Sequence, residues 1–309
     1  MAGGCYIGLW MSGKGIRRDS FHESLSGRAE MKDARRGTAE LKHELLQAVA
    51  AGRLNLHYQP KFWLDSGELQ GVEALLRWRS ESGVWIAPAV FTPVLEESGA
   101  IHEACRWVFK RAATDCAYWL HCGRDVRRVA INVSPVQLRG RDGPPSILDL
   151  CAGWPAGNAQ LDVELTESAL VSNSSEVVDL LKRLSAQNVV VALDDFGCGY
   201  SSLSLLADLP VRHLKIDRTF ISLLSSSRRA EKVVQAIVSL AHELGMETVA
   251  EGIETVDQLN RVRTLGCEIG QGFLFSQALD RESLLGLLPL ATAAQRPWRC
   301  ESGGVRVHR

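Results

Sequence analysis

One stretch in the middle of the chain constrains the fold most strongly: residues 189–203, with the sequence VVVALDDFGCGYSSL. Its apolar, β-branched run leads into two neighbouring carboxylates, Asp194 and Asp195, and then into a glycine-rich turn. A short apolar run bounded by glycines is typical of a buried strand in a parallel sheet. Because such sheets carry their chemistry at the carboxyl ends of the strands, both aspartates are expected on the working face. A surface turn is the alternative reading, since Asp and Gly are common in turns.

Predicted strands and helices alternate along most of the chain. The link between the first two strands is too short for a crossover helix, which needs a dozen or more residues, so these strands are expected to form an antiparallel hairpin. The eight strand patterns cover 54–58, 71–78, 128–134, 161–167, 189–193, 213–217, 248–253 and 268–275. This order predicts an α/β fold, a modified (β/α)8 TIM-type barrel with an antiparallel first strand. An open doubly wound sheet is the alternative, but the G-x-G-x-x-G fingerprint that it needs after an early strand is missing.

The two ends of the chain lack this regularity. Residues 1–38 are expected to be a poorly ordered leader or linker, 39–290 the barrel, and 291–309 a C-terminal tail.

The net charge of −1 gives no reason to expect duplex nucleic acid as a partner. No apolar run reaches the length of a membrane span. The eight cysteines form no C-x-x-C pair, which favours reduced thiols and a cytoplasmic location.

Nearly every predicted strand carries a polar residue close to its end. In chain order these residues are Glu73, Asn132, Glu164, Asp194 with Asp195, Lys215, Glu251 and Gln271. They recur roughly once per strand–helix unit of a barrel, about 30 residues, so they are expected to converge on one pocket. Carboxylates packed together stay ionised only if cations neutralise them. Oxygen ligands from Glu, Asp and Asn suit Mg²⁺ or Mn²⁺.

This combination of residues favours two-metal hydrolysis of a phosphoester. Two adjacent aspartates suit a bridged pair of metals, Lys215 is placed to hold or polarise a metal-bound water, and Arg77 has the fork geometry for a phosphate. A glycosidase is the alternative, because many barrels use two carboxylates to cleave sugars. Five carboxylates with an Asn and a Lys exceed what that chemistry needs, and most tryptophans fall in helix patterns instead of a sugar-binding groove.

Eight short motifs stand around these residues, in a fixed order between positions 41 and 288. They are YQP at 58–60, EALLRW at 73–78, NVS at 132–134, ELTE at 164–167, DDFGCGYSSL at 194–203, LKID at 214–217, AEGIET at 250–255 and QGFLFS at 271–276. The series resembles the EAL domain family of bacterial cyclic di-GMP phosphodiesterases, whose barrel also has an antiparallel first strand. The resemblance implies hydrolysis of cyclic di-GMP to linear 5'-pGpG, which lowers the level of this second messenger. It further implies two divalent cations, Mg²⁺ or Mn²⁺, and a homodimer formed through the barrel.

The resemblance also implies roles for individual residues. Lys215 matches the position that holds the attacking water, with Glu251 and Glu73 as further catalytic residues. The metal-ligand positions are Glu73, Asn132, Glu164, Asp194, Asp195 and Glu251. The substrate-side positions are Gln59, Arg77 and Gln271, and the supporting and loop positions are Glu167, Glu254, Phe196, Gly197, Gly199 and Ser201.

In the family, the loop over 196–202 couples dimerisation to metal binding. Cys198 stands in this loop where a threonine or serine is usual, and a thiol is a weaker hydrogen-bond donor than a hydroxyl. A non-catalytic cyclic di-GMP receptor, or a protein-interaction module on the same fold, is the alternative function. Such domains usually lack one or more metal ligands, whereas this sequence retains all of them.

Overall fold

The computed structural model describes residues 39–138, 146–155, 159–171, 174–197 and 203–291. The expectations for residues 1–38, for Cys198, Gly199 and Ser201, and for positions 292–309 lie outside these ranges. The chain separates into two compact units, Met1–His43 and Glu44–Arg309. The second unit holds every described strand and every candidate site residue.

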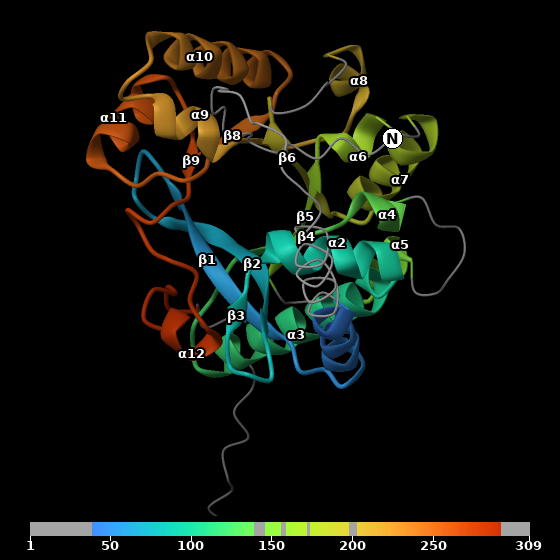
Figure 1. Cartoon of the computed structure of the whole chain (residues 1–309). Helices are drawn as coiled ribbons and strands as arrows, with labels where there is room; N and C mark the ends of the chain where they lie inside the picture. The colour runs from blue at the N-terminus through green and yellow to red at the C-terminus, as the bar shows by residue number, and fades with distance from the viewer. Residues whose placement is uncertain (1–38, 139–145, 156–158, 172–173, 198–202, 292–309) are drawn as a thin grey trace, which may run out of the picture. The chain divides into compact units, whose positions relative to one another are not determined.

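Within the described ranges, nine strands form one sheet. They are β1 (Asn55–Trp63), β2 (Leu69–Arg79), β3 (Trp85–Ile86), β4 (Arg128–Asn132), β5 (Gln160–Thr166), β6 (Val190–Phe196), β7 (His213–Ile216), β8 (Glu247–Ala250) and β9 (Ile269–Gly270). Their order is β1-β9-β8-β7-β6-β5-β4-β2-β3, and β1 also pairs with β2 (Figure 1). Eight strands therefore close into a barrel, to which β3 adds an outer hairpin arm. The predicted α/β barrel is confirmed.

The first strand runs against its neighbours, as the short link to the second strand predicts. β1 is antiparallel to β2 and to β9, whereas the pairs from β2–β4 round to β8–β9 are all parallel. The register joins Gln59 to Glu73 and Lys61 to Gly71. These pairs matter for the site, because directly opposed residues in a ladder point to the same face of the sheet.

Helices connect the strands and pack around the sheet. They are α2 (Pro88–Ser98), α3 (Ile101–His121), α4 (Pro135–Leu138), α5 (Ile147–Ala152), α6 (Ser168–Val171), α7 (Ser174–Ala186), α8 (Leu203–Asp208), α9 (Arg218–Leu223), α10 (Arg228–Glu243), α11 (Val256–Thr264) and α12 (Arg281–Leu284). A further helix covers residues 39–50. Across the described ranges, no helix combines the length and the apolar character needed to cross a bilayer.

Alternation along β5 shows how the barrel sorts its side chains. Leu161, Val163 and Leu165 belong to the hydrophobic core between the sheet and its helices. Successive strand residues point to opposite faces, so Asp162 and Glu164 point toward the inside of the barrel. Both carboxylates are buried, at different heights along the same strand.

The amino ends of the parallel strands are tied together by paired charges. Asp162 accepts two hydrogen bonds from Arg128, at 2.7 Å from Nη2 and 3.2 Å from Nε. His213 Nε2 lies 3.0 Å from Glu247 Oε2, and its Nδ1 lies 3.7 Å from Asp162. Polar groups at the amino end of a TIM-type barrel serve stability, and active sites lie at the carboxyl end of the strands.

Candidate metal centre and active site

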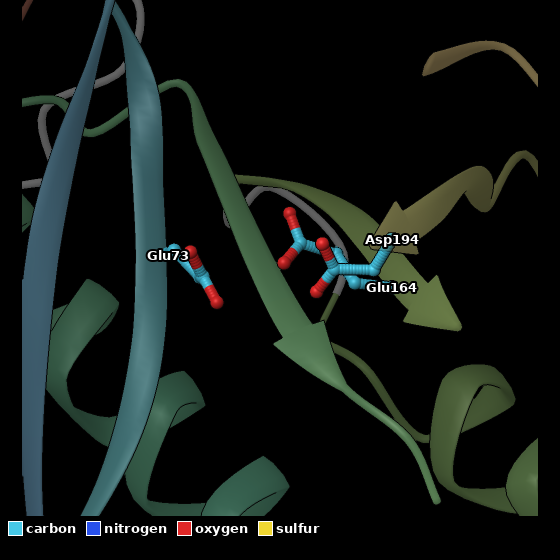
Figure 2. A group of neighbouring side chains, drawn as sticks. All are labelled: Glu73, Glu164 and Asp194. Carbon is cyan, nitrogen blue, oxygen red and sulfur yellow. The ribbon is translucent and has the colours of Figure 1, made fainter. Parts of the chain in front are cut away.

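The predicted site residues meet at the carboxyl end of the barrel. Glu73, Glu164 and Asp194 lie in β2, β5 and β6, and Figure 2 shows their side chains turned toward one space between these strands. Asn132 ends β4, Lys215 lies in β7, and Glu251 and Gln271 directly follow β8 and β9. The structure thus brings together side chains that are spread over 199 positions of the sequence, from Glu73 to Gln271 inclusive.

The ammonium group of Lys215 lies among the carboxylates. Its Nζ is 2.7 Å from an oxygen of Glu164 and of Glu251, 3.1 Å from Asp194 and 3.6 Å from Glu73. Burial alone would lower the pKa of Lys215, but the surrounding carboxylates raise it well above its ordinary value. Lys215 is therefore a fixed positive charge in this site.

A second lysine, Lys61 in β1, reaches the same cluster and is missing from the sequence prediction. Its Nζ lies 3.1 Å from Glu164 Oε1, and its side chain is 2% exposed. The β1–β2 register places it two pairs beyond Gln59 and Glu73, and therefore on the same face of the sheet. Alternation in β1 was the one available signal, but a lysine is by default expected at the surface.

Crowding of negative charge shifts the pKa values of the carboxylates. Burial is the largest cause of the raised pKa of Glu73, Asp194 and Glu251, and repulsion from neighbouring carboxylates adds to it. Burial also opposes ionisation of Glu164, but Lys215 and Lys61 together outweigh it and lower its pKa to about 2. Glu164 therefore has two ammonium partners, whereas Glu73, Asp194 and Glu251 share the single ammonium group of Lys215.

The end of β6 has an irregular backbone that brings two consecutive aspartates to the site. The ladder with β7 shifts register between Leu193 and Phe196, and Asp195 has a left-handed φ of 55°. In a regular strand Asp194 and Asp195 would point to opposite faces. With this bulge, one oxygen of each lies within 4.8 Å of the other and of an oxygen of Glu251. Such strain is typical of functional sites.

Two amides donate hydrogen bonds to Glu73, and a third amide, Gln59, is linked to one of them. Asn132 Nδ2 donates to Glu73 Oε1 at 2.6 Å, and Gln271 Nε2 donates to Glu73 Oε2 at 2.7 Å. Gln271 also donates to Gln59 Oε1 at 2.8 Å, and Gln59 donates to the Ser276 carbonyl at 3.2 Å. The buried Oε1 of Gln271 has no hydrogen-bond partner within the described ranges. A buried oxygen without a hydrogen-bond donor is available to accept a hydrogen bond from a bound ligand.

Two further predicted residues, Arg77 and Glu254, have different surroundings. Arg77 is half-buried in β2 and donates to the Leu76 carbonyl at 3.1 Å. Burial lowers the pKa of Arg77, and the nearby negative charge of Glu73 raises it, so the two charged groups interact. Glu254 is exposed, and its backbone N–H donates to Gln258 Oε1 at 2.8 Å. Its described contact is therefore with the start of α11.

The loop after β6 is attached to β5 through a glutamate. The Gly197 N–H donates to Glu167 Oε2 at 3.0 Å, which is the contact expected of an anchoring glutamate. Phe196 is buried, and Gly197 has a φ of 95°. A Cβ at Gly197 would approach the Phe220 ring to 2.9 Å, so both conformation and space require glycine there. Gly199 and Ser201 lie outside the described residues.

The carboxylates form two overlapping groups with the spacing of metal ligands. One group is Glu73, Glu164 and Asp194, and the other is Asp194, Asp195 and Glu251, with ligand oxygens within 4.8 Å of one another in each. Asp194 belongs to both groups. Hard oxygen donors with excess negative charge suit Mg²⁺ or Mn²⁺, so the residues present fit divalent cations.

Comparisons with known proteins agree with this geometry. The family profile described as "EAL domain" matches residues 42–278. Among curated proteins, the chain is 40% identical over 255 residues to "Cyclic di-GMP phosphodiesterase NbdA" of Pseudomonas aeruginosa, covering 81% of this chain and 32% of that protein. It is 34% identical over 250 residues to "Oxygen sensor protein DosP" of Escherichia coli, covering 80% and 31%. The chain thus spans about a third of the length of these relatives.

A solved structure matches over almost its full length. "PaMucR Phosphodiesterase, c-di-GMP complex" superposes with a TM-score of 0.73 at 37% identity, covering 79% of this chain and 99% of that one. The family profile covers well over half of the chain, and its match includes every residue of the carboxylate cluster. The chain belongs to the EAL domain family.

Proposed function

We propose that this chain hydrolyses one phosphodiester bond of cyclic di-GMP to give linear 5'-pGpG, with two divalent cations. The observation that carries the proposal is the pair of carboxylate groups that share Asp194 at the carboxyl end of the barrel. Two cations a few ångströms apart are the arrangement that clamps both oxygens of an in-line displacement at phosphorus. The substrate class is supported by relatives named cyclic di-GMP phosphodiesterases and by the PaMucR complex.

Each cation would have its own set of ligands. Glu73, Glu164 and Asp194 would hold one, with the carbonyl oxygen of Asn132 beside them, since its amide already contacts Glu73. Asp194, Asp195 and Glu251 would hold the other. Bound Mg²⁺ or Mn²⁺ supplies a water of lowered pKa and neutralises charge on the phosphate.

The chain's own residues position and stabilise the reacting groups. Lys215 carries a strongly raised pKa and is held by Glu251 at 2.7 Å, so we assign it an electrostatic role toward the attacking water in preference to that of a base. Arg77 offers a guanidinium for a phosphate oxygen. Gln59 and Gln271 are linked by a hydrogen bond, and the unpartnered Oε1 of Gln271 would accept from the substrate.

Product analysis tests the proposal. Purified protein is incubated with cyclic di-GMP and either Mg²⁺ or Mn²⁺, and the nucleotides are separated by chromatography, with a chelator control. We expect linear 5'-pGpG only when a divalent cation is present. Intact dinucleotide retained on the folded protein would contradict hydrolysis and favour the receptor function. The expected homodimer rests on the family resemblance alone, and light scattering in solution tests it separately.

A further inference from the structure

Glu164 differs from the other carboxylates of the cluster because each of its oxygens has its own ammonium partner. Lys61 Nζ donates to Oε1 at 3.1 Å, and Lys215 Nζ donates to Oε2 at 2.7 Å. The Glu164 side chain is fully buried, and both lysines are nearly so. Without solvent to replace either partner, the two contacts fix the plane of this carboxylate.

The two lysines contact different sides of Glu164. Lys215 also contacts oxygens of Glu73, Asp194 and Glu251, so Oε2 faces the space that the metal-ligand groups share. Lys61 comes from the deeper Lys61–Gly71 pair of the β1–β2 ladder, and its ion pair within the described ranges is with Glu164. Lys61 therefore holds the oxygen that faces away from the other ligands.

We propose that Lys61 is a positioning residue, which holds Glu164 Oε1 from beneath so that Oε2 stays turned toward a divalent cation shared with Glu73 and Asp194. The inference rests on the proposed function only insofar as the cluster binds divalent cations. Groups that hydrogen-bond metal ligands from outside typically contribute about 10- to 100-fold to metal affinity. Lys61 is such a group, because it donates a hydrogen bond to Glu164.

The direction in which cation affinity changes when Lys61 is removed distinguishes a positioning role from a purely electrostatic one. If Lys61 acted only through its positive charge, its removal would make the site more negative and would strengthen the binding of a cation. If Lys61 positions Glu164, its removal frees a buried carboxylate to turn, and cation binding weakens. A merely structural ion pair would change the stability of the protein and leave cation affinity as it was.

The test is a calorimetric titration of Mn²⁺ into the metal-free protein, without nucleotide. The variants are Lys61→Met, which removes the charge at similar volume, and Lys61→Gln, which keeps a shorter N–H donor and serves if the Met variant does not fold. The matched control is Arg128→Met, which removes the cation from Asp162, the other buried carboxylate of β5. Thermal unfolding of each metal-free variant is measured in parallel.

We expect Lys61→Met to weaken Mn²⁺ binding by about 10-fold or more, and Lys61→Gln by several-fold. Arg128→Met is expected to lower the unfolding temperature and keep the wild-type Mn²⁺ affinity. Unchanged or tighter Mn²⁺ binding in a folded Lys61 variant overturns the positioning role while leaving the proposed function intact. A wild-type protein that binds no Mn²⁺ overturns both, and Mn²⁺ binding without hydrolysis overturns only the proposed function.

Discussion

At the scale of single residues, Glu73 shows how closely the ligands depend on one another. Its two oxygens accept from Asn132 and Gln271, and Lys215 lies 3.6 Å away. Replacing Glu73 by Gln keeps the shape but removes the charge, a cation ligand and one acceptor. We expect turnover of cyclic di-GMP to fall by at least about 100-fold, since even partners outside the ligand shell contribute 10- to 100-fold.

Initial rates at saturating Mn²⁺ measure the effect of Glu73→Gln, with the circular dichroism spectrum as a check on folding. The matched comparison is Glu254→Gln, because Glu254 is exposed and its described contact is with α11. That variant is expected to retain more activity than Glu73→Gln. Wild-type turnover in a folded Glu73→Gln protein would contradict the assignment of Glu73 as a ligand.

The left-handed backbone of Asp195 leads to a prediction about stability. A non-glycine residue in this conformation costs about 1–2 kcal/mol, and glycine avoids most of that cost. Asp195→Gly should therefore be more stable than Asp195→Ala by about 1 kcal/mol in urea unfolding, although both lose a ligand. Asn188 has a φ of 61° and lies outside the site, so Asn188→Gly and Asn188→Ala are the parallel pair of variants. Equal stability of the two Asp195 variants would show that the positive φ stores no strain.

The sequence and the structure differ most at Lys61. The carboxylates, Asn132 and Lys215 are recognisable because each stands near the end of an apolar strand pattern. Lys61 lies three residues beyond the strand predicted over 54–58, and the observed register with Gly71 shows that it points into the barrel. A buried lysine needs carboxylate partners that are distant in sequence, and no local pattern predicts them.

At the scale of elements, the hairpin of β1 and β2 and the order of the strands follow from the sequence. The alternation of apolar residues and the short link between the strands determine them. The strand expected over 268–275 is wrong in length, since β9 covers only Ile269–Gly270. Its continuation instead turns to run beside the backbone of Ile253. The short strand β3 is not predicted, and α2 carries Pro93 in its interior, which obscures the helical pattern.

The turn after β9 positions Gln271 through a close approach of two backbones. A Cβ on Gly272 would lie 2.2 Å from the Ile253 carbonyl oxygen and 2.3 Å from its nitrogen, so the segments would have to move apart. Gly272→Ala is expected to lower the free energy of unfolding by about 3 kcal/mol or more and to reduce turnover. Gly286→Ala is the control, because nothing lies within 4 Å of its added Cβ and its φ is not positive.

Urea unfolding and initial rates of the two alanine variants test the role of this turn. Gly286→Ala should differ little from the wild type in both measurements. If Gly272→Ala were as stable and as active as Gly286→Ala, then the contact with Ile253 would not be what holds Gln271 in place.

At the scale of the whole barrel, the two ends balance charge differently. At the amino end, Asp162 is paired with Arg128, and His213 with Glu247. At the carboxyl end, five carboxylates (Glu73, Glu164, Asp194, Asp195 and Glu251) face two lysines, so three negative charges are left without a lysine when all five are ionised. An excess of negative charge of this kind opposes folding unless cations bind.

This imbalance predicts how pH changes stability. Glu73, Asp194 and Glu251 have raised pKa values in the fold, so the unfolded chain loses these protons first as pH rises above about 4.5. Their contribution is therefore present at low pH and is lost as pH rises toward their folded pKa values. Glu164, with its pKa of about 2, has the opposite sign, but its contribution is constant above about pH 5.

The measurement is the unfolding temperature with and without Mn²⁺ between about pH 5 and about pH 8. Bound cations need ionised ligands, so the Mn²⁺-induced rise in unfolding temperature should be larger at about pH 8 than at about pH 5. Glu73→Gln should show a smaller rise throughout. A rise that shrinks with increasing pH would contradict the charge balance described for the cluster.

The central claim is that the carboxylate cluster binds two divalent cations that share Asp194, and diffraction from crystals soaked in Mn²⁺ tests it most directly. Anomalous scattering locates manganese independently of any activity. We predict two anomalous peaks, one among Glu73, Glu164 and Asp194 and the other among Asp194, Asp195 and Glu251. Two results from well-diffracting crystals would contradict the claim. In one, Mn²⁺ is bound elsewhere; in the other, Lys215 remains the only cation of the cluster and no anomalous peak lies beside it.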